Sequence, residues 1–101
     1  MEKNIQMSML LDIYAPLLTS KQQDFLDLYY NQNLSLAEIA EDANITRQGV
    51  RKIIVDGEKN LLEFESKLKF LEKKLTNNKI IEELIEETED TNFKVKLKKL
   101  L

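Results

Sequence analysis

Five polar or basic side chains of the kinds that contact nucleic acid lie within seven consecutive residues. They are Thr46, Arg47, Gln48, Arg51 and Lys52. Arginine and lysine neutralise phosphate charge, and threonine and glutamine can donate hydrogen bonds to phosphate or to base edges. On a helix, Gln48, Arg51 and Lys52 share one face, because Arg51 and Lys52 follow Gln48 by three and four residues. The chemistry that this group indicates is contact with phosphates and bases.

Catalytic and metal-binding chemistry has few candidate residues in this chain. The sequence contains no cysteine and no histidine, which excludes disulfides, thiol chemistry, Cys/His zinc sites and histidine acid–base catalysis. The carboxylates fall on the expected solvated faces of helices, and no spacing pairs a nucleophile with a base. We therefore expect a protein that is not an enzyme, with no catalytic residue, no metal and no other cofactor.

Residues 36–55 have the spacing of a helix-turn-helix, which would hold the contact residues on a rigid element. Ser35 and Glu38 form a capping-box pair at the start of the first helix, and Asn44 suits the left-handed backbone of the turn. Thr46 can cap the second helix. Apolar residues recur at helical spacing on the inner face of both helices. These residues are Leu36, Ile39, Ala40 and Ala43 in the first helix, and Val50, Ile53 and Ile54 in the second.

The charge of the whole chain opposes nucleic-acid binding, whereas the local charge of the motif favours it. The chain has 15 Lys and Arg against 18 Asp and Glu, for a net charge of −3. It therefore lacks the basic footprint of an ordinary nucleic-acid-binding domain. Residues 44–55 carry a charge of +3 from Arg47, Arg51 and Lys52 and contain no acid. A patch of this size supports weak phosphate contact at physiological salt.

Two further helices are expected before the motif. The first carries apolar residues at helical spacing and ends or kinks at Pro16, which has no backbone N–H to donate. The second opens with the capping-box pair Thr19 and Gln22. Its aromatic residues Phe25 and Tyr29 are expected in the core with the apolar residues of the motif, rather than in base stacking.

After the motif, apolar residues continue at alternating spacings of four and three. This seam comprises Val50, Ile54, Gly57, Leu61, Phe64, Leu68, Leu71 and Leu75, the heptad pattern of a coiled coil. No proline falls between Arg47 and Leu75, so the sequence predicts one long unbroken helix. Two uses of the seam stay open: pairing with a second copy of the chain, or packing on the chain's own helices. In a homodimer, the dimer seam would comprise Leu61, Phe64, Leu68, Leu71 and Leu75.

The end of the chain alternates between apolar and charged segments. Residues 76–78, Thr-Asn-Asn, predict a turn, and the apolar residues of 80–85 predict a short amphipathic helix. The block 82–90 carries six acids and no base, and the run 93–101 carries four lysines and no acid. The alternation within 93–101 also fits a strand, but we expect a helix, because nothing else in the chain offers a strand edge to pair with.

The composition as a whole indicates an all-α fold. The chain has only two glycines and one proline, the residues that most often form turns, so it has few positions suited to the turns of sheets or to long loops. No apolar run approaches the length of a membrane span, and the start of the chain does not follow a signal-peptide pattern. We expect a cytoplasmic protein without membrane insertion. We expect a helix-turn-helix domain at residues 1–57, and a long helix extension with a short helical tail at residues 58–101.

Five short motifs between Ile5 and Leu75 carry a family resemblance. They are LLTSKQ at 17–22, LYY at 28–30, SL at 35–36, EIAE at 38–41 and RQGV at 47–50. In this region the sequence resembles the YlxM (UPF0122) family, which are small bacterial helix-turn-helix proteins similar to region 4 of sigma factors. It differs from the family's pattern at Arg51, where an aromatic residue is usual, and at Val55 and Asp56, where a basic pair is usual.

The resemblance implies a link to the signal recognition particle, because the family's genes lie beside those for the particle's GTPase. It also implies a regulatory or assembly role rather than catalysis. Two functions follow. In the first, the second motif helix contacts DNA or the RNA of the particle, and the protein is a regulatory or accessory component of that pathway. In the second, the protein is an adaptor that binds the particle's GTPase without direct nucleic-acid contact.

Overall fold

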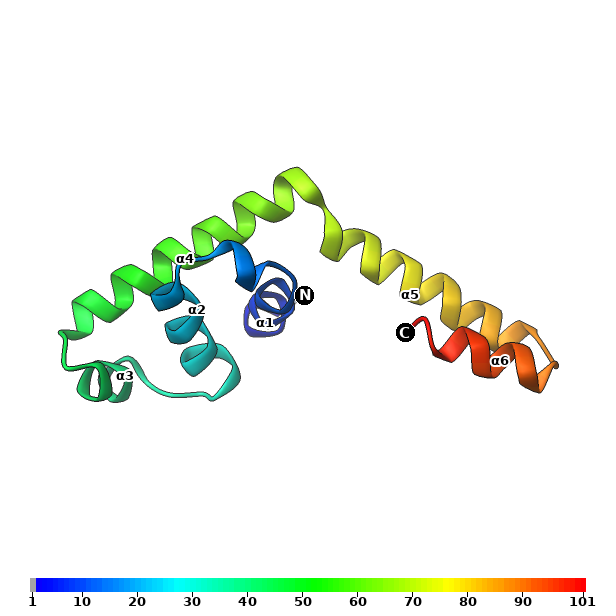
Figure 1. Cartoon of the computed structure of the whole chain (residues 1–101), viewed down its shortest axis with the longest axis horizontal. Coiled ribbons are helices and arrows are strands. Elements are labelled where there is room, and N and C mark those ends of the chain that lie inside the picture. Colours follow the sequence, from blue (N-terminus) through cyan, green and yellow to red (C-terminus); the bar gives the residue numbers. More distant parts are fainter. Residues whose placement is uncertain (1) are drawn as a thin grey trace. The chain divides into compact units, whose positions relative to one another are not determined.

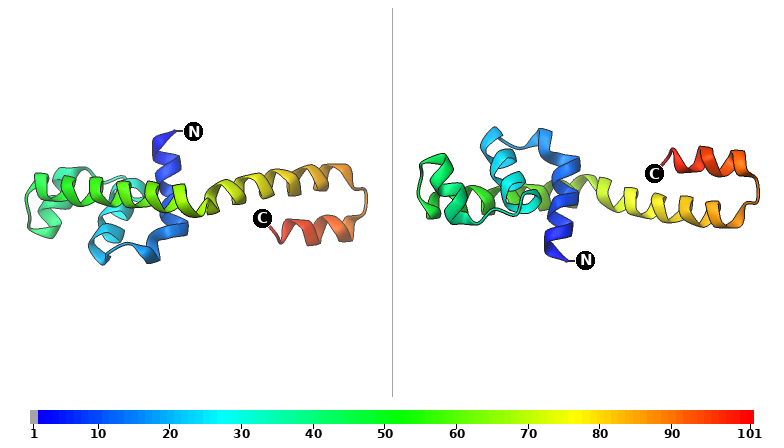
Figure 2. Two further views of the ribbon diagram at one scale, coloured as in Figure 1. Left: turned by 90° about the horizontal axis from the view of Figure 1, so that it is seen from above. Right: turned by 90° about the horizontal axis from the view of Figure 1, so that it is seen from below.

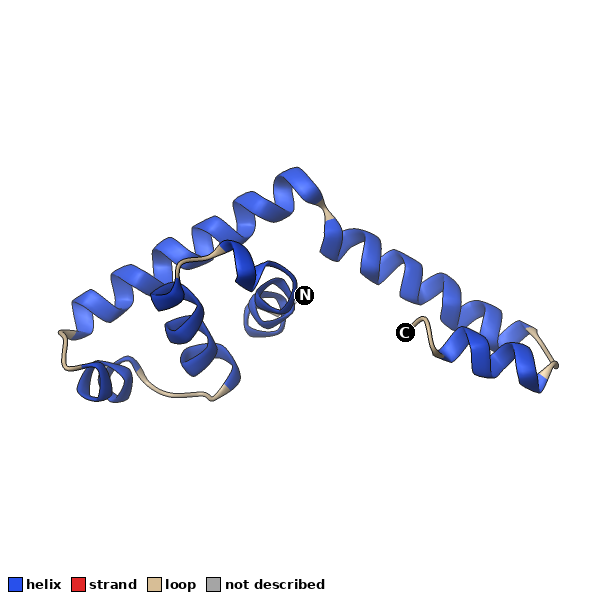
Figure 3. Cartoon of the chain, viewed as in Figure 1, coloured by secondary structure: helices blue, strands red, loops and turns tan. Residues whose placement is uncertain are grey.

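The computed structural model describes residues 2–101, and within this range the regular structure is entirely helical (Figure 3). Six α-helices and no strand occur in these residues, which confirms the all-α prediction. The chain divides into two compact units, one ending at Leu68 and the other running from Lys69 to Leu101.

The first unit contains four α-helices, and the longest of them, α4, packs against the other three (Figures 1 and 2). In chain order the elements are α1 (Lys3–Tyr14), the 3₁₀ helix η1 (Ala15–Leu17), α2 (Ser20–Leu26), the π-helical turn η2 (Asp27–Asn31), α3 (Leu36–Ala43) and α4 (Arg47–Leu68). Pro16 lies in η1, directly after α1, where the missing N–H of proline ends a helix. Helices α3 and α4 form the predicted helix-turn-helix.

Both predicted capping boxes are present. The backbone N–H of Gln22 donates to Thr19 Oγ1 at 3.2 Å, and that of Glu38 donates to Ser35 Oγ at 3.1 Å. In each pair the longer side chain accepts the N–H of the cap residue in return. Asn44 ends α3 with a φ of 56°, the left-handed conformation that asparagine tolerates better than most residues. The local signals of the sequence therefore start and end these helices as expected.

The core of the first unit lies between α4 and the three shorter helices. The buried residues of α4 are Val50, Ile54, Gly57 and Leu61. The other buried side chains of the unit are Met7, Leu10, Leu11, Tyr14, Leu18, Phe25, Leu26, Ile39 and Ala40. The first half of the apolar seam therefore packs on the chain's own helices. Leu36, Ile53 and Tyr29, which the sequence also assigned to the core, are half-buried.

Gly57 is buried where α2 crosses α4 closely. A Cβ atom on Gly57 would lie 2.7 Å from Leu26 Cδ1 and 3.5 Å from Gln22 Cβ. Leu26 is itself fully buried, so a side chain at position 57 would have to displace it. A glycine in the middle of a helix costs about 1 kcal/mol relative to alanine. Here that cost is offset by the close approach that the missing Cβ allows.

A tyrosine of α1 makes contacts that extend the first unit beyond Gly57. Tyr14 Oη donates to Glu65 Oε1 at 2.6 Å, and the Tyr14 ring centroid lies 5.9 Å from that of Phe64. Both partners belong to the second half of α4. Because α1 packs against this half of the helix, the first compact unit extends to Leu68.

Glu58 connects two further elements to α4. Lys3 Nζ of α1 lies 3.1 Å from Glu58 Oε2, and Tyr30 of η2 faces the same carboxylate. Burial raises the pKa of the Tyr30 hydroxyl, and the negative charge of Glu58 raises it further. Tyr30 therefore stays a neutral hydrogen-bond donor, so α1, η2 and α4 are held together by polar as well as apolar contacts.

Helix α4 ends at Leu68, whereas the sequence predicted a helix unbroken to Leu75. Lys69 has the left-handed angles φ 56° and ψ 30°, and α5 (Phe70–Glu87) begins directly after it. The prediction was wrong because alternating apolar spacing reports only which face of a helix is buried. A single left-handed residue interrupts the backbone hydrogen bonds and leaves that spacing in the sequence unchanged.

The second unit is an antiparallel hairpin of α5 and α6 (Thr91–Lys98), which lie side by side in every view (Figures 1 and 2). The Asp90 carboxylate caps α6 by accepting hydrogen bonds from the N–H groups of Asn92 at 2.9 Å and Phe93 at 3.2 Å. The helix expected within 93–101 is confirmed as α6. Within residues 2–101, no helix combines the length and the apolarity needed to cross a membrane.

The turn predicted at residues 76–78 is wrong, because these residues lie inside α5. Threonine and asparagine in a helix cost at most about 0.7 kcal/mol each relative to alanine. Good helix formers flank them on both sides, and α6 packs along the same helix. The continuous helix is therefore favoured over a break whose freed backbone groups would need new partners.

Candidate nucleic-acid interface

The packing of α4 decides which of its side chains face outward near its first turns. Val50 and Ile54 are fully or almost fully buried against the rest of the first unit. Residues on the opposite side of the helix are consequently exposed. All five residues that the sequence predicted for nucleic-acid contact are exposed in the structure: Thr46, Arg47, Gln48, Arg51 and Lys52. The structure thus brings them together on one surface at the start of α4.

Thr46 occupies the position that caps α4. Its Oγ1 accepts a hydrogen bond from the N–H of Gly49 at 3.0 Å, and its carbonyl oxygen accepts from the N–H of Val50. The hydroxyl hydrogen of Thr46 remains able to donate outward. The amino-terminal end of a helix also carries a partial positive charge that favours anions. This end of α4 therefore adds to the attraction of the basic side chains.

A shallow hollow of about 260 Å³ separates the beginnings of α3 and α4. It is lined by Leu36, Arg47, Gln48 and Arg51. Two guanidinium groups and one amide thus border a depression with an apolar side chain on its other wall. An arginine can form two parallel hydrogen bonds with a phosphate or a guanine edge. The hollow is where the chain could make such contacts.

The basic residues of this surface differ in whether a nearby carboxylate pairs with them. Lys52 Nζ lies 3.0 Å from Asp56 Oδ2 one turn later on α4. Arg47 and Arg51 make no ion pair within residues 2–101. An exposed pair such as Lys52–Asp56 contributes little to stability, but it lowers the positive charge that Lys52 offers to a phosphate. The two arginines are therefore the main cationic groups of the site.

Exposed acids on α3 balance the positive charge of α4. They are Glu38, Glu41 and Asp42. The backbone N–H of Ser35 donates to Glu38 and lowers the pKa of its carboxyl group, so Glu38 is ionised at neutral pH. The basic side chains of the helix-turn-helix are consequently limited to the start of α4, where they form a small positively charged surface.

The region that the structure describes offers no alternative centre for metal chemistry. Within residues 2–101, no group of three or more Asp or Glu side chains is arranged to hold a metal ion.

Comparison with known proteins gives the chain its family. A family model described as "Putative helix-turn-helix protein, YlxM / p13 like", UPF0122, matches residues 1–101. The chain belongs to the UPF0122 family. A UPF0122 protein of Clostridium kluyveri is 54% identical over 74 residues, which cover 73% of this chain and 67% of the relative. A UPF0122 protein of Clostridium botulinum is 43% identical over 90 residues, covering 89% and 83% of the two chains.

A third UPF0122 protein, from Clostridium perfringens, is 40% identical over 102 aligned residues that cover all of this chain and 91% of the relative. The UPF0122 match therefore includes the α5–α6 hairpin. The sequence analysis had found the resemblance only up to about Leu75. The second unit is consequently part of what the UPF0122 family shares.

The five residues of the predicted dimer seam have different environments. Leu61 is fully buried in the first unit, and Phe64 packs against a tyrosine ring of α1. Leu71 is 6% exposed, whereas Leu68 and Leu75 are 41% and 37% exposed. The first two residues are thus occupied within one chain, and the backbone break at position 69 interrupts the seam before Leu71.

Sequence reasoning missed an acidic groove on the first unit. It has a volume of about 380 Å³ and lies between α2, η2 and α3. Its apolar residues include Phe25, Leu28 and Ile39, and its acids are Asp24, Asp27 and Asp42. The three acids are spread over 19 residues of sequence, and only the packing of α3 on η2 brings them to one groove. No signal of local spacing could have found it.

Proposed function

We propose that this UPF0122 protein is a non-enzymatic binding protein that contacts nucleic-acid phosphates through the start of α4. The observation that carries the proposal is the exposed set of Arg47, Gln48 and Arg51 around the hollow beside the helix's amino-terminal end. In helix-turn-helix proteins the second motif helix enters the major groove with its amino-terminal residues at the base edges. The same residues of α4 are the exposed ones here.

The family resemblance extends the proposal to a biological setting. We infer a regulatory or accessory role in the signal recognition particle pathway, in the cytoplasm, with DNA or the RNA of the particle as the ligand. The net charge of −3 and the acids of α3 predict weak binding near physiological salt. Such affinity suits a protein whose specificity is shared with other components of an assembly.

The test is a fluorescence-anisotropy titration of the full chain with labelled duplex DNA and with signal recognition particle RNA over a range of salt concentrations. We expect Arg51→Ala to weaken binding and to flatten the dependence of log K on log[salt] by about 0.9 for duplex DNA or about 0.7 for single strands. Arg47→Ala should behave in the same way. Circular dichroism of each variant checks that the fold is unchanged.

Lys59→Ala is the matched control. Lys59 is exposed on the same helix and makes no ion pair within residues 2–101, but it lies about two turns beyond Arg51, the last residue of α4 that lines the hollow. Its removal should alter the salt dependence far less than the removal of Arg51. Equal effects of Lys59→Ala and Arg51→Ala would show that the basic residues attract nucleic acid only through general charge, and the proposed face would be refuted.

The acidic groove supports a second candidate function, an adaptor that binds a basic protein such as the particle's GTPase. Asn31 Nδ2 and Gln32 Nε2 donate to the Asp27 carboxylate at 2.7 Å and 2.9 Å. These hydrogen bonds, that of Asn31 foremost, lower the pKa of Asp27, so the groove keeps its charge at neutral pH. Apolar walls with acids at the edge fit a basic amphipathic helix.

A pull-down from lysate, with and without nuclease, separates the two functions. The adaptor function is supported if the protein still captures the GTPase after nuclease treatment and if the double variant Asp24→Asn/Asp42→Asn no longer captures it. Capture that requires intact nucleic acid and is lost in Arg51→Ala would support the nucleic-acid contact.

A further inference from the structure

The second unit buries very little apolar surface within itself. Between Lys69 and Leu101, only Leu71 and Leu97 are buried. The sequence contains no cysteine, so no disulfide closes the hairpin. Units of fewer than about 40 residues usually need a disulfide, a metal or association with another chain to be stable. The hairpin of α5 and α6 is a unit of this kind.

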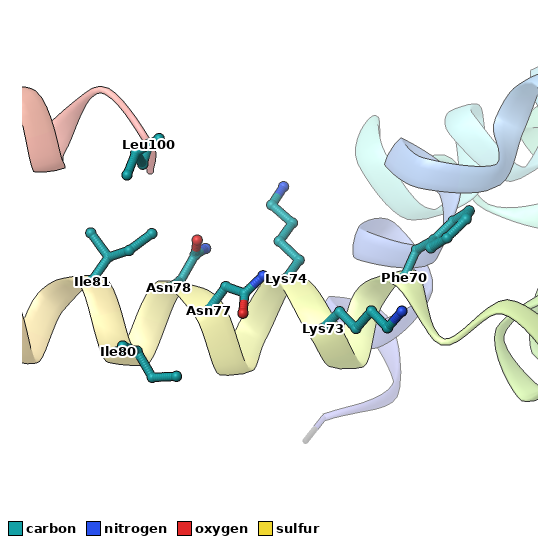
Figure 4. A pocket seen from close by; sticks show the side chains of 8 residues that line it. All are labelled: Phe70, Lys73, Lys74, Asn77, Asn78, Ile80, Ile81 and Leu100. Carbon is teal, nitrogen blue, oxygen red and sulfur yellow. The ribbon is translucent and has the colours of Figure 1, made fainter.

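Large apolar side chains are instead exposed on the hairpin. They are Leu75, Ile80, Leu84, Phe93, Val95, Leu100 and Leu101, with exposed fractions between 37% and 65%. Two of them, Ile80 and Leu100, line an open hollow of about 580 Å³, where Ile81 and Leu100 lie across from each other beside Asn78 (Figure 4). Ile80 and Lys73 contribute to the same hollow. Large apolar side chains exposed on so small a unit are candidates for contact with another surface.

One face of α5 has opposite charges at its two ends. At spacings of four, three, four and three, the residues of this face are Lys73, Asn77, Ile80, Leu84 and Glu87. All five are exposed. The face is basic at one end, acidic at the other and apolar between them. Two copies of such a face are complementary only when they run in opposite directions. Lys73 of each copy then meets Glu87 of the other, and Ile80 lies near the symmetry axis.

We propose that this face is the dimer interface of the protein, and that its occupant is the same face of a second copy in antiparallel orientation. Leu84 of one copy packs beside Asn77 of the other, next to the hollow that Leu100 borders. A parallel arrangement would place Lys73 against Lys73 and Glu87 against Glu87. Such like-charge contacts disfavour it.

A dimer of this kind carries two helix-turn-helix units. Two linked sites bind a multisite ligand more tightly than one site, without any additional contact per site. The pairing itself does not depend on the nucleic-acid contact proposed above, so either one can fail while the other holds.

Sedimentation equilibrium of the full chain tests the dimer, because the monomer mass is 11.9 kDa. We expect twice that mass in the micromolar range. Ile80→Glu should weaken association about 100-fold or more, since one apolar contact is lost from each copy. Ile80 is 49% exposed in the single chain, so helicity should be kept. Leu17→Glu, at a residue of the first unit that is 57% exposed, is the control and should leave the dimer intact.

Two results would overturn the interface. One is a wild-type chain that stays monomeric at several hundred micromolar. The other is a dimer that Leu68→Glu dissociates and Ile80→Glu does not, because association would then use the α4 side of the predicted seam.

Charge reversal tests the antiparallel orientation without touching an apolar residue. Lys73→Glu alone and Glu87→Lys alone should each associate more weakly than wild type at low salt, because like charges then meet. A mixture of the two variants should form a heterodimer in which both charge contacts are restored. High salt should reduce these differences. Failure of the mixture to associate more tightly than either variant alone would refute the antiparallel pairing.

Discussion

Replacing Gly57 with alanine tests the close crossing of α2 and α4 on which the first unit depends. The new Cβ atom would lie 2.7 Å from Leu26 Cδ1, well inside van der Waals contact. Because Leu26 is fully buried, its side chain cannot rotate into solvent to relieve the clash. Overpacking of this kind costs about 1–3 kcal/mol, and alanine returns about 1 kcal/mol through its helix propensity. We expect a net loss of up to about 2 kcal/mol.

Gly49→Ala is the matched control, since it makes the same chemical change in the same helix. A Cβ atom on Gly49 would lie 3.2 Å from Thr46 Oγ1 and 3.6 Å from Ile45 Cδ1. Ile45 Cδ1 is the end of an exposed side chain, and Thr46 Oγ1 need shift by only a few tenths of an ångström, so it can keep the hydrogen bond from the Gly49 N–H that caps α4. Gly57→Ala should therefore be less stable than Gly49→Ala by about 1–3 kcal/mol, the overpacking term alone.

Urea unfolding followed by circular dichroism gives the free energy of unfolding of each variant. The double variant Leu26→Ala/Gly57→Ala completes the comparison, because removing the Leu26 side chain makes room for the new methyl group. In that background the added methyl should be neutral or stabilising, which a double-mutant cycle reports as a favourable coupling. If Gly57→Ala were as stable as Gly49→Ala, the close crossing would not constrain position 57, and the reasoning would be refuted.

Two further predictions concern stability. Ala40 is 6% exposed in the core of the helix-turn-helix, so Ala40→Leu should lower the free energy of unfolding by about 1–3 kcal/mol through overpacking; an unchanged melting transition would contradict this packing. Because hydrogen bonds from Asn31 and Gln32 lower the pKa of Asp27, its ionised form stabilises the fold above the unfolded-state pKa near 3.8, and this contribution is lost as the pH falls through the lower folded-state pKa. Asp27→Asn should thus make acid unfolding less steep than in wild type or in Asp24→Asn, and identical acid transitions in all three proteins would exclude this role.

Local interactions let the sequence determine most of the helical framework. A capping box joins residues three positions apart, so Thr19 with Gln22 and Ser35 with Glu38 could be read directly. The left-handed turn at Asn44 follows from a preference of that residue type. The exposure of the contact residues at the start of α4 followed from helical periodicity alone. The Lys52–Asp56 pair could also have been found, because its spacing of four is a local signal.

Tertiary packing decided the features that depend on residues far apart in sequence. The heptad pattern did not distinguish packing of α4 on its own chain from packing on a second copy. In the first unit, the close approach of Leu26 to Gly57 and the hydrogen bond from Tyr14 to Glu65 show that α4 packs on its own chain. The acidic groove exists only because α3 packs on η2. The backbone break at Lys69 leaves no trace in the apolar spacing.

The face of α5 from Lys73 to Glu87 depends on both the local sequence and the tertiary packing. Its spacing and its charges were present in the sequence, but a turn predicted at residues 76–78 divided them between two elements. The low helix propensity of those three residues is a local quantity, and it is outweighed by the helix on either side and by the packing of α6. Only the folded hairpin makes the five positions a single continuous surface.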